Sequence, residues 1–220
     1  MGNFATERGS RGPGHPARAL LAAAVISMLL AACAAPKPTG PMMLHPLPPN
    51  LEGYSLTQGA VVYTGPEFTV SARPWDYRLV AEEFRRSGEP CPFGDSDEAV
   101  GRFLFLRVRL ENRSTRALVF NPMRASLLRE GEAPILPLEN SDLFAFAGDA
   151  IADAEARGRA FRRVSFDITA TVRPGQTLER YLAFRAPKEM GKPFMLSIQD
   201  LWFGGTSFDL MFPFEAYPGK

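Results

Sequence analysis

The chain has 220 residues, and its 25 Lys and Arg side chains are almost balanced by 24 Asp and Glu, which leaves a formal net charge of +1. This balance offers neither the basic excess that nucleic-acid binding requires nor the acidic excess of a disordered tail. Hydrophobic residues make up 45% of the chain and include 17 Phe, which is enough for the core of one domain of ordinary size. No nucleic-acid partner is therefore expected.

Residues 1–32 have the layout of a secretory signal peptide. The first part is polar and carries three arginines against one carboxylate, Glu7. The run 19–32 is uncharged and almost wholly apolar, and it is shorter than the ~20 residues that a helix needs to cross a bilayer. A basic segment, a short apolar segment and small residues before a cleavage site are the three parts of such a peptide. We therefore expect residues 1–32 to be removed.

The end of this segment, Leu30-Ala31-Ala32-Cys33, resembles a bacterial lipobox. The resemblance implies cleavage before Cys33, acylation of its thiol and a bacterial cell-envelope location, with the lipid bilayer as a partner. Each buried CH₂ contributes ~0.8 kcal/mol, so two or more acyl chains hold a protein firmly. Ala34 stands where an Asp would imply retention in the inner membrane, which favours the outer membrane, facing the periplasm. The alternative is an ordinary signal peptide followed by an unrelated cysteine.

Prolines at positions 36, 38, 41, 46, 48 and 49 punctuate the segment 33–50. Pro-rich segments are extended and semi-rigid, so residues 33–50 are predicted to be a lipidated linker and residues 51–220 the folded domain. The tract Met42-Met43-Leu44-His45 offers thioethers and an imidazole, which are soft ligands for Cu(I). The favoured interpretation is a spacer that contains a few apolar residues.

The first part of the domain predicts two strands and a short helix. Residues 60–64 are β-prone and end at Gly65-Pro66, and the run 67–73 alternates between apolar and polar side chains, as a half-buried strand does. The segment 76–86 then spaces its apolar residues as a helix does. Asp76 is its candidate N-cap and Gly88 its stop signal.

The clearest strand is 102–110, in which Leu104, Leu106, Val108 and Leu110 alternate with Phe103, Phe105, Arg107 and Arg109. The segment 111–115 is a predicted turn that leads to a strand at 117–120. Asn112-Arg113-Ser114 fits the N-glycosylation pattern, but in a bacterium a turn Asn is the favoured interpretation. Residues 125–129 and 133–136 flank Glu130-Gly131-Glu132, which predicts a hairpin.

The hydrophobic period changes to that of a helix over residues 141–163. Its apolar stripe comprises Phe144, Ala147, Ile151, Ala154, Gly158 and Phe161. Acidic residues occupy the first half and arginines the last, which complements the helix dipole. Further strands are predicted at 166–172, 178–184, 194–198 and 208–214, with a loop at Trp202-Phe203-Gly204-Gly205.

About seven to nine short strands on one domain predict a mostly β fold, an antiparallel β-sandwich with an inserted helix at 141–163 and a short helix at 76–86. The tract 103–138 resembles the Ig-like extracytoplasmic domains found on bacterial lipoproteins of unknown function. These have a strand, an Asn-x-Ser turn, a second strand and a Gly-containing hairpin. The resemblance implies an Ig-like sandwich, and the helix at 141–163 departs from it as an insertion.

The residue inventory provides no recognisable catalytic set, cofactor motif or metal site. The chain has two His, and the domain lacks the imidazole that a Ser–His–Asp or Cys–His site needs. Asp95, Asp97 and Glu98 are candidate Ca²⁺ ligands, but a solvated acidic loop is favoured because the EF-hand spacing fails. Cys91 is either an exposed thiol for intermolecular pairing or a small apolar residue under a loop, and the second is favoured.

The sequence therefore favours a membrane-anchored, non-catalytic binding, scaffold or assembly module with an envelope protein or the cell wall as partner. Candidate partner-binding residues are the basic side chains Arg159, Arg162 and Arg163 at the end of the helix and the aromatic pair Trp202 and Phe203. The alternative is a ligand-binding or carboxylate-based enzyme domain that acts on an envelope substrate. A deep pocket lined by convergent acids would favour this alternative.

Overall fold

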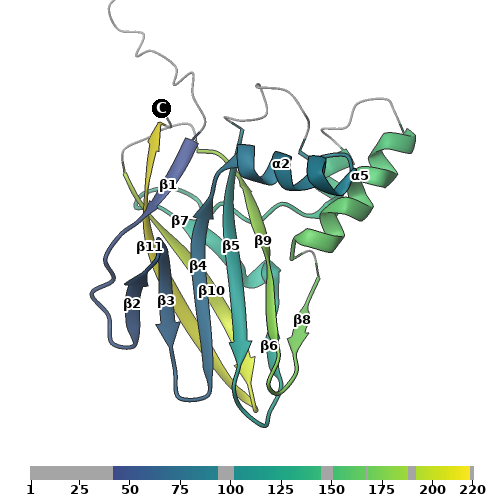
Figure 1. Ribbon diagram of the computed structural model, residues 1–220. Helices are drawn as coiled ribbons and strands as arrows, with labels where there is room; N and C mark the ends of the chain where they lie inside the picture. Colours follow the sequence, from purple (N-terminus) through teal and green to yellow (C-terminus); the bar gives the residue numbers. More distant parts are fainter. Residues whose placement is uncertain (1–41, 94–101, 145–150, 167, 188–191, 219–220) are drawn as a thin grey trace, which may run out of the picture. The chain divides into compact units, whose positions relative to one another are not determined.

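Two antiparallel sheets face each other in the computed structural model, which describes residues 42–93, 102–144, 151–166, 168–187 and 192–218 (Figure 1). One sheet has five strands, in the order β2 (Tyr54–Thr57), β3 (Ala60–Thr64), β4 (Phe68–Trp75), β5 (Phe103–Asn112) and β9 (Thr177–Arg185). The other has the order β1 (Met42–Pro46), β11 (Thr206–Pro218), β10 (Pro193–Phe203), β6 (Leu118–Phe120) and β8 (Ala170–Val172), and β7 (Ala125–Leu128) also pairs with β10. The predicted antiparallel β-sandwich is confirmed.

β5 is the central strand of the five-stranded sheet, since it lies between β4 and β9. Its residues Leu104, Leu106 and Val108 point into the space between the sheets and are 1%, 0% and 0% exposed. They join a core to which both sheets contribute, including Phe212 and Phe214 of β11. The alternation read from the sequence is confirmed, because a strand with period-2 apolar residues buries one whole face.

The short helix predicted at 76–86 is α2 (Tyr77–Ser87). The Asp76 side chain accepts a hydrogen bond from the Arg78 N–H at 2.8 Å and so caps its first turn. Gly88 ends the helix in the left-handed conformation, with φ of 70°, and its N–H bonds back to the carbonyls of the last turn. Both sequence signals therefore act as predicted.

The helix predicted at 141–163 corresponds to two described helices, α4 (Asn140–Phe144) and α5 (Ile151–Val164), and residues 145–150 lie outside the described residues. On α5 the predicted apolar stripe is buried at Ala154, Gly158 and Phe161. A Cβ atom added to Gly158 would lie 2.8 Å from the side-chain oxygen of Asn140. The small residue in the stripe therefore allows α4 to approach α5 closely.

A second hydrophobic cluster lies on the outer face of the five-stranded sheet, where α2 and α5 cover the upper end of β5 and β9 (Figure 1). Phe103 and Phe105, on the face of β5 opposite the main core, pack in it with Phe84 of α2 and Phe161 of α5. Both faces of β5 are thus buried at this end. The helices cover only this end, and the rest of the outer face is polar.

Two sequence assignments are corrected by the described strands. Met42–Pro46, predicted as linker, pairs with β11 as β1, and its Leu44 is only 5% exposed, because one inward apolar side chain suffices for a short edge strand. The folded domain therefore begins before residue 51. The strand predicted at 166–172 is shorter, since only Ala170–Val172 pairs, and Ile168 is 71% exposed.

Asn112 at the end of β5 holds the following turn to the opposite sheet. Its side chain is 1% exposed and donates hydrogen bonds to the carbonyl oxygens of Arg116 and Val172. Its oxygen accepts from the N–H and hydroxyl of Ser114. The prediction of a turn Asn is confirmed, because all four hydrogen-bonding positions of the amide are used inside the protein.

Among the described residues, no helix is long and apolar enough to cross a membrane.

Candidate functional site: an arginine groove on the sheet

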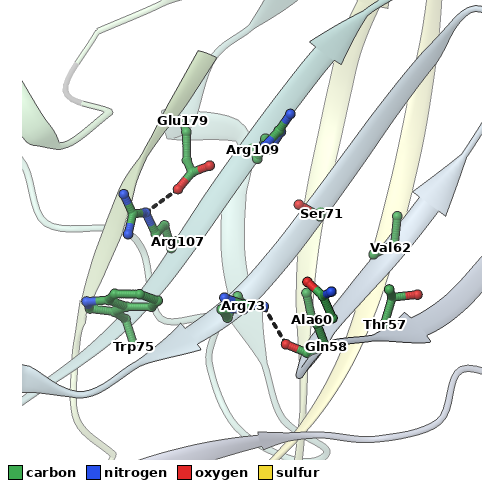
Figure 2. A pocket seen from close by; sticks show the side chains of 10 residues that line it. All are labelled: Thr57, Gln58, Ala60, Val62, Ser71, Arg73, Trp75, Arg107, Arg109 and Glu179. Atoms are coloured by element: carbon green, nitrogen blue, oxygen red, sulfur yellow. Dashed lines mark hydrogen bonds and ion pairs between the residues drawn. The ribbon is translucent and has the colours of Figure 1, made fainter. Parts of the chain in front are cut away.

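The polar part of the outer face of the five-stranded sheet contains a groove of about 270 Å³. Figure 2 shows the side chains that line it, which come from β2 to β5, the β2–β3 turn and β9. They are Thr57, Gln58, Ala60, Val62, Ser71, Arg73, Trp75, Arg107, Arg109 and Glu179. We call this site the arginine groove, because three of its side chains are guanidinium groups.

Strand periodicity places these residues on one face. On β4 the inward positions include Phe68, Val70 and Ala72, which are 2%, 0% and 0% exposed, so the intervening Ser71 and Arg73 must face outward. On β5 the same alternation turns Arg107 away from the core. The sequence therefore makes the strands strongly amphipathic here, with an arginine-bearing outer face.

The pairing of β4 with β5 brings the arginines together. In the register, Arg73 lies directly opposite Arg107, and Ser71 lies opposite Arg109. Residues directly opposite on one face have Cβ atoms roughly 5 Å apart, and like charges in that position destabilise a sheet. Nearby acids or a bound anion would relieve the repulsion between two arginines kept opposite each other.

The acids present compensate part of this charge. Arg107 forms an ion pair with Glu179 of the neighbouring strand β9, and Arg109 lies 3.6 Å from Glu111. Arg73 donates a hydrogen bond to the backbone carbonyl of Gln58 (Figure 2). Of the two acids, Glu179 lines the groove with the three guanidinium groups and Glu111 does not. The groove therefore carries a net positive charge.

Trp75 forms one end of the groove. Its ring stacks with the guanidinium of Arg107, whose central carbon is 4.7 Å from the ring centroid. This cation–π contact orients Arg107. The indole Nε1 of Trp75 is buried and has no hydrogen-bond partner within the described part of the chain. A buried donor without an acceptor costs free energy, so Trp75 contributes its ring and not this N–H to the groove.

Tyr181 and Glu83 mark the boundary between the groove and the helix-covered part of the sheet. The Tyr181 hydroxyl donates a hydrogen bond to the Glu83 carboxylate of α2. Burial raises the pKa of Tyr181, and this hydrogen bond raises it further. Because Tyr181 also lies 5.6 Å from the guanidinium of Arg107, it links α2 to the groove.

Of the residues that the sequence proposed for partner binding, the three arginines lie on α5 and the two aromatic residues on β10. Arg159, Arg162 and Arg163 are exposed on α5. Arg163 forms an ion pair with Glu89, and Arg159 lies 3.9 Å from Glu155, so acids reduce the charge of this patch.

The two aromatic candidates lie at the end of β10 instead of in a loop. Trp202 is 49% exposed, but Phe203 is only 3% exposed. The Phe203 ring packs against Phe68, with centroids 5.4 Å apart, and the Arg116 guanidinium covers it at 4.5 Å. The assignment of Phe203 to a partner-binding surface is therefore wrong: β10 extends to this residue and turns it into the core.

The remaining candidate ligands are placed as follows. Cys91 is 3% exposed in the cluster under the helices, which confirms the interpretation as a small buried residue. Asp95, Asp97 and Glu98 lie outside the described residues. Among the residues that the structure describes, no group of three or more His, Cys, Asp or Glu side chains is arranged to hold a metal ion.

Sequence reasoning did not identify the arginine groove. Arg107 and Arg109 were placed opposite the apolar face of their strand, but nothing local indicated that β4 would bring Arg73 and Trp75 beside them. The sequence signal for the groove was the presence of charged side chains on the second face of the most hydrophobic strand. A strand covered on both faces would carry apolar side chains at these positions.

No family model matches the chain, and no curated protein matches it. Among solved structures, the yjhA protein from Bacillus subtilis aligns with 68% of this chain and 93% of its own, at 10% identity and a TM-score of 0.38. A similarity at this level carries no argument about function.

Proposed function

We propose that the protein is a lipid-anchored component of a bacterial envelope whose β-sandwich is a non-catalytic binding module, with the arginine groove as its ligand site. The observation that carries this proposal is the register that places Arg73 opposite Arg107 in an open groove with a net positive charge. Arginine presents five N–H donors in a rigid fork that matches carboxylates and phosphates. The groove therefore suits recognition of an anionic group on an envelope partner.

The chemistry of the lining supports binding more than catalysis. A hydrolase of the glycosidase type uses two carboxyl groups that flank the scissile bond. Glu179 is the carboxylate among the residues that line the groove, and it is engaged by Arg107. Convergent acids, which would favour the enzyme alternative, do not line this groove.

The tether proposed at Cys33 places the module close to a membrane. Since β1 begins at Met42, residues 34–41 separate the first strand from the acylated thiol. A fully extended chain covers at most ~3.6 Å per residue, so β1 begins within roughly 30 Å of the lipid surface. Partners within reach are components of the same envelope, either proteins or cell-wall material.

Two measurements test the proposal. For the tether, Cys33→Ser should leave the chain either released or uncleaved; a Cys33→Ser protein that is correctly cleaved and still fractionates with membranes would contradict it. For the groove, the detergent-solubilised lipoprotein should capture material from its native envelope, and Arg73→Gln with Arg109→Gln should reduce that capture.

Arg124→Gln is the matched control for capture, because Arg124 is an exposed arginine that does not line the groove and is not a candidate for partner binding. Equal capture by the groove variant and this control, with both proteins folded, would refute the groove as the ligand site. If Arg159, Arg162 and Arg163 instead provide the binding surface, changing all three to Glu should abolish capture at low salt.

A further inference from the structure

We infer that the ligand of the arginine groove is an acidic polysaccharide, bound through its carboxylate groups. This inference rests on the proposed function and adds to it the chemical class of the ligand. It follows from the spacing of the positive charges, from the neutral residues between them and from the course of the groove across the sheet.

The positive charges form a row. Arg107 and Arg109 are two residues apart on β5, which is roughly 7 Å along a strand, and Arg73 lies beside Arg107 on β4. A single phosphate is typically held at one focus by converging backbone N–H groups, as at a helix N-terminus or a nest. Side-chain guanidinium groups spread along two strands suit a ligand that carries single negative charges at intervals, as a chain of sugar acids does.

The arginines retain donors for such a ligand. The contacts of Arg73 and Arg107 within the groove engage the Gln58 carbonyl and Glu179, respectively. A guanidinium group has five N–H donors, so both arginines can still offer N–H groups to a carboxylate. A carboxylate that bridges Arg73 and Arg107 would also neutralise the repulsion between two like charges placed directly opposite each other.

The neutral lining fits the rest of a sugar. Thr57, Gln58 and Ser71 provide hydroxyl and amide groups beside the arginines, and these can both donate and accept hydrogen bonds with sugar hydroxyls. Trp75 adds an aromatic surface beside Arg107. Recognition of charge alone would need neither the hydroxyl and amide groups nor the aromatic ring.

The surroundings of Trp75 give the ligand a direction. Trp75 also lines a hollow of about 310 Å³ beside α2, together with Glu82, Glu83, Arg86 and Arg107. The two carboxylates balance the two guanidinium groups there, and Glu82 is ion-paired with Arg86, so this hollow has no positive excess. The polysaccharide should therefore run from Trp75 along β4 and β5 toward Arg109, where the positive charge is in excess.

The test uses the intrinsic fluorescence of the groove. The chain has two Trp residues, so Trp202→Phe leaves Trp75 as the reporter. The full lipoprotein is prepared in a polyoxyethylene detergent, which has no sugar headgroup, and titrated with tetragalacturonate, with maltotetraose as the neutral tetrasaccharide and with inorganic phosphate. We expect tetragalacturonate alone to change the emission of Trp75, and we expect added salt to weaken its binding.

Variants then locate the site. Loss of a charge-assisted hydrogen bond should weaken tetragalacturonate binding about tenfold or more for Arg73→Gln and for Arg109→Gln, whereas Arg124→Gln, at an exposed arginine outside the groove, should bind as the parent does. Because these arginines lie at the protein surface, both groove variants should fold, which circular dichroism and the thermal midpoint verify. Two groove variants are used so that a folding defect in one leaves the test intact.

Several results would overturn the inference. They are equal binding of maltotetraose, displacement of tetragalacturonate by phosphate at equal concentration, binding that is unchanged in both groove variants, and no binding at low salt. If tetragalacturonate fails while envelope capture still depends on Arg73 and Arg109, the proposed binding function stands and only the ligand class is refuted. If vesicles with anionic headgroups bind in a groove-dependent manner and tetragalacturonate does not, the target is the membrane surface.

Discussion

Replacement of Asn112, the last residue of β5, with Ala should markedly destabilise the protein. The Asn112 Nδ2 lies 2.6 Å from the Arg116 carbonyl oxygen and 2.9 Å from the Val172 carbonyl oxygen. Its Oδ1 accepts from the Ser114 N–H at 3.1 Å and from the Ser114 hydroxyl at 2.8 Å. One amide therefore closes the β5–β6 turn and joins it to β8.

The cost follows from what the truncation leaves behind. An intramolecular hydrogen bond contributes a net ~0.5–1.5 kcal/mol, and a buried group left without a partner costs ~1–3 kcal/mol. The bond to Val172 is buried, so this cost applies in full to its carbonyl. Ser114 and Arg116 are near solvent, and water can replace part of their bonds. The free energy of unfolding should fall by about 2–4 kcal/mol, which lowers the thermal midpoint of a domain this size by roughly 4–16 °C.

Urea denaturation followed by circular dichroism measures this change directly. Asn121→Ala is the matched control, because the Asn121 side chain caps the short 3₁₀-helix Pro122–Arg124 with one exposed hydrogen bond, to the Met123 N–H at 3.0 Å. Loss of such a cap costs about 0.5–2 kcal/mol. If Asn112→Ala unfolds at the same urea concentration as this control, the buried bond to Val172 does not stabilise the fold as argued.

Two further predictions concern the core and the helix-covered face. Leu106 is 0% exposed in the central strand, so Leu106→Ala should lower the free energy of unfolding by ~2–5 kcal/mol. Leu79 is 47% exposed on α2, so the control Leu79→Ala should change it by less than ~0.5 kcal/mol. Similar denaturation midpoints for the two variants would contradict the assigned core. Burial and the Glu83 carboxylate raise the pKa of Tyr181 above its usual value of 10, so the folded state holds this proton more tightly than the unfolded state. The resulting stability is complete below pH ~10 and is lost as the pH rises further. Tyr181→Phe should therefore show a shallower decline of the unfolding free energy above pH ~10, and identical slopes would refute the raised pKa of Tyr181.

The elements that the sequence predicted correctly are those determined by local pattern. β5 alternates between apolar and charged residues from Leu106 to Glu111, so its inward and outward faces could be assigned before any pairing was known. The helix α2 has a capping Asp76 and a terminal Gly88, and each acts through bonds to its own turn. These signals do not depend on the rest of the fold.

The elements that were missed depend on distant partners. β1 has one core-facing residue, Leu44, and it is a strand because β11 supplies a partner edge. In β10 the pairing with β11 shifts between Ile198 and Leu201, where Asp200 adopts a φ of 51°. This irregularity lets Ile198 and Leu201 both face the core although they are three residues apart, and it continues the strand so that Phe203 is also buried. A strict period of two could not predict it.

The candidate site could be predicted from the sequence only in part. That Arg107 and Arg109 face away from the core follows from the sequence of β5 alone. That they meet Arg73 follows from the register between β4 and β5, two strands that lie about 30 residues apart in the chain, and no local pattern specifies this register. A slip of one residue would turn Arg73 into the core and Ala72 outward.

Burial of the hydrophobic face of β4 therefore enforces the arrangement of the arginines. Val70 and Ala72 are each 0% exposed, and the core energy that fixes them in place also holds Arg73 opposite Arg107. The repulsion between these two charges is small compared with the burial of a strand face, at roughly 25 cal/mol per Å² of apolar surface. The fold can thus maintain a row of like charges that would not assemble by itself. A ligand that neutralises the row would bind to a site already formed, and little of its binding energy would be spent on ordering the side chains.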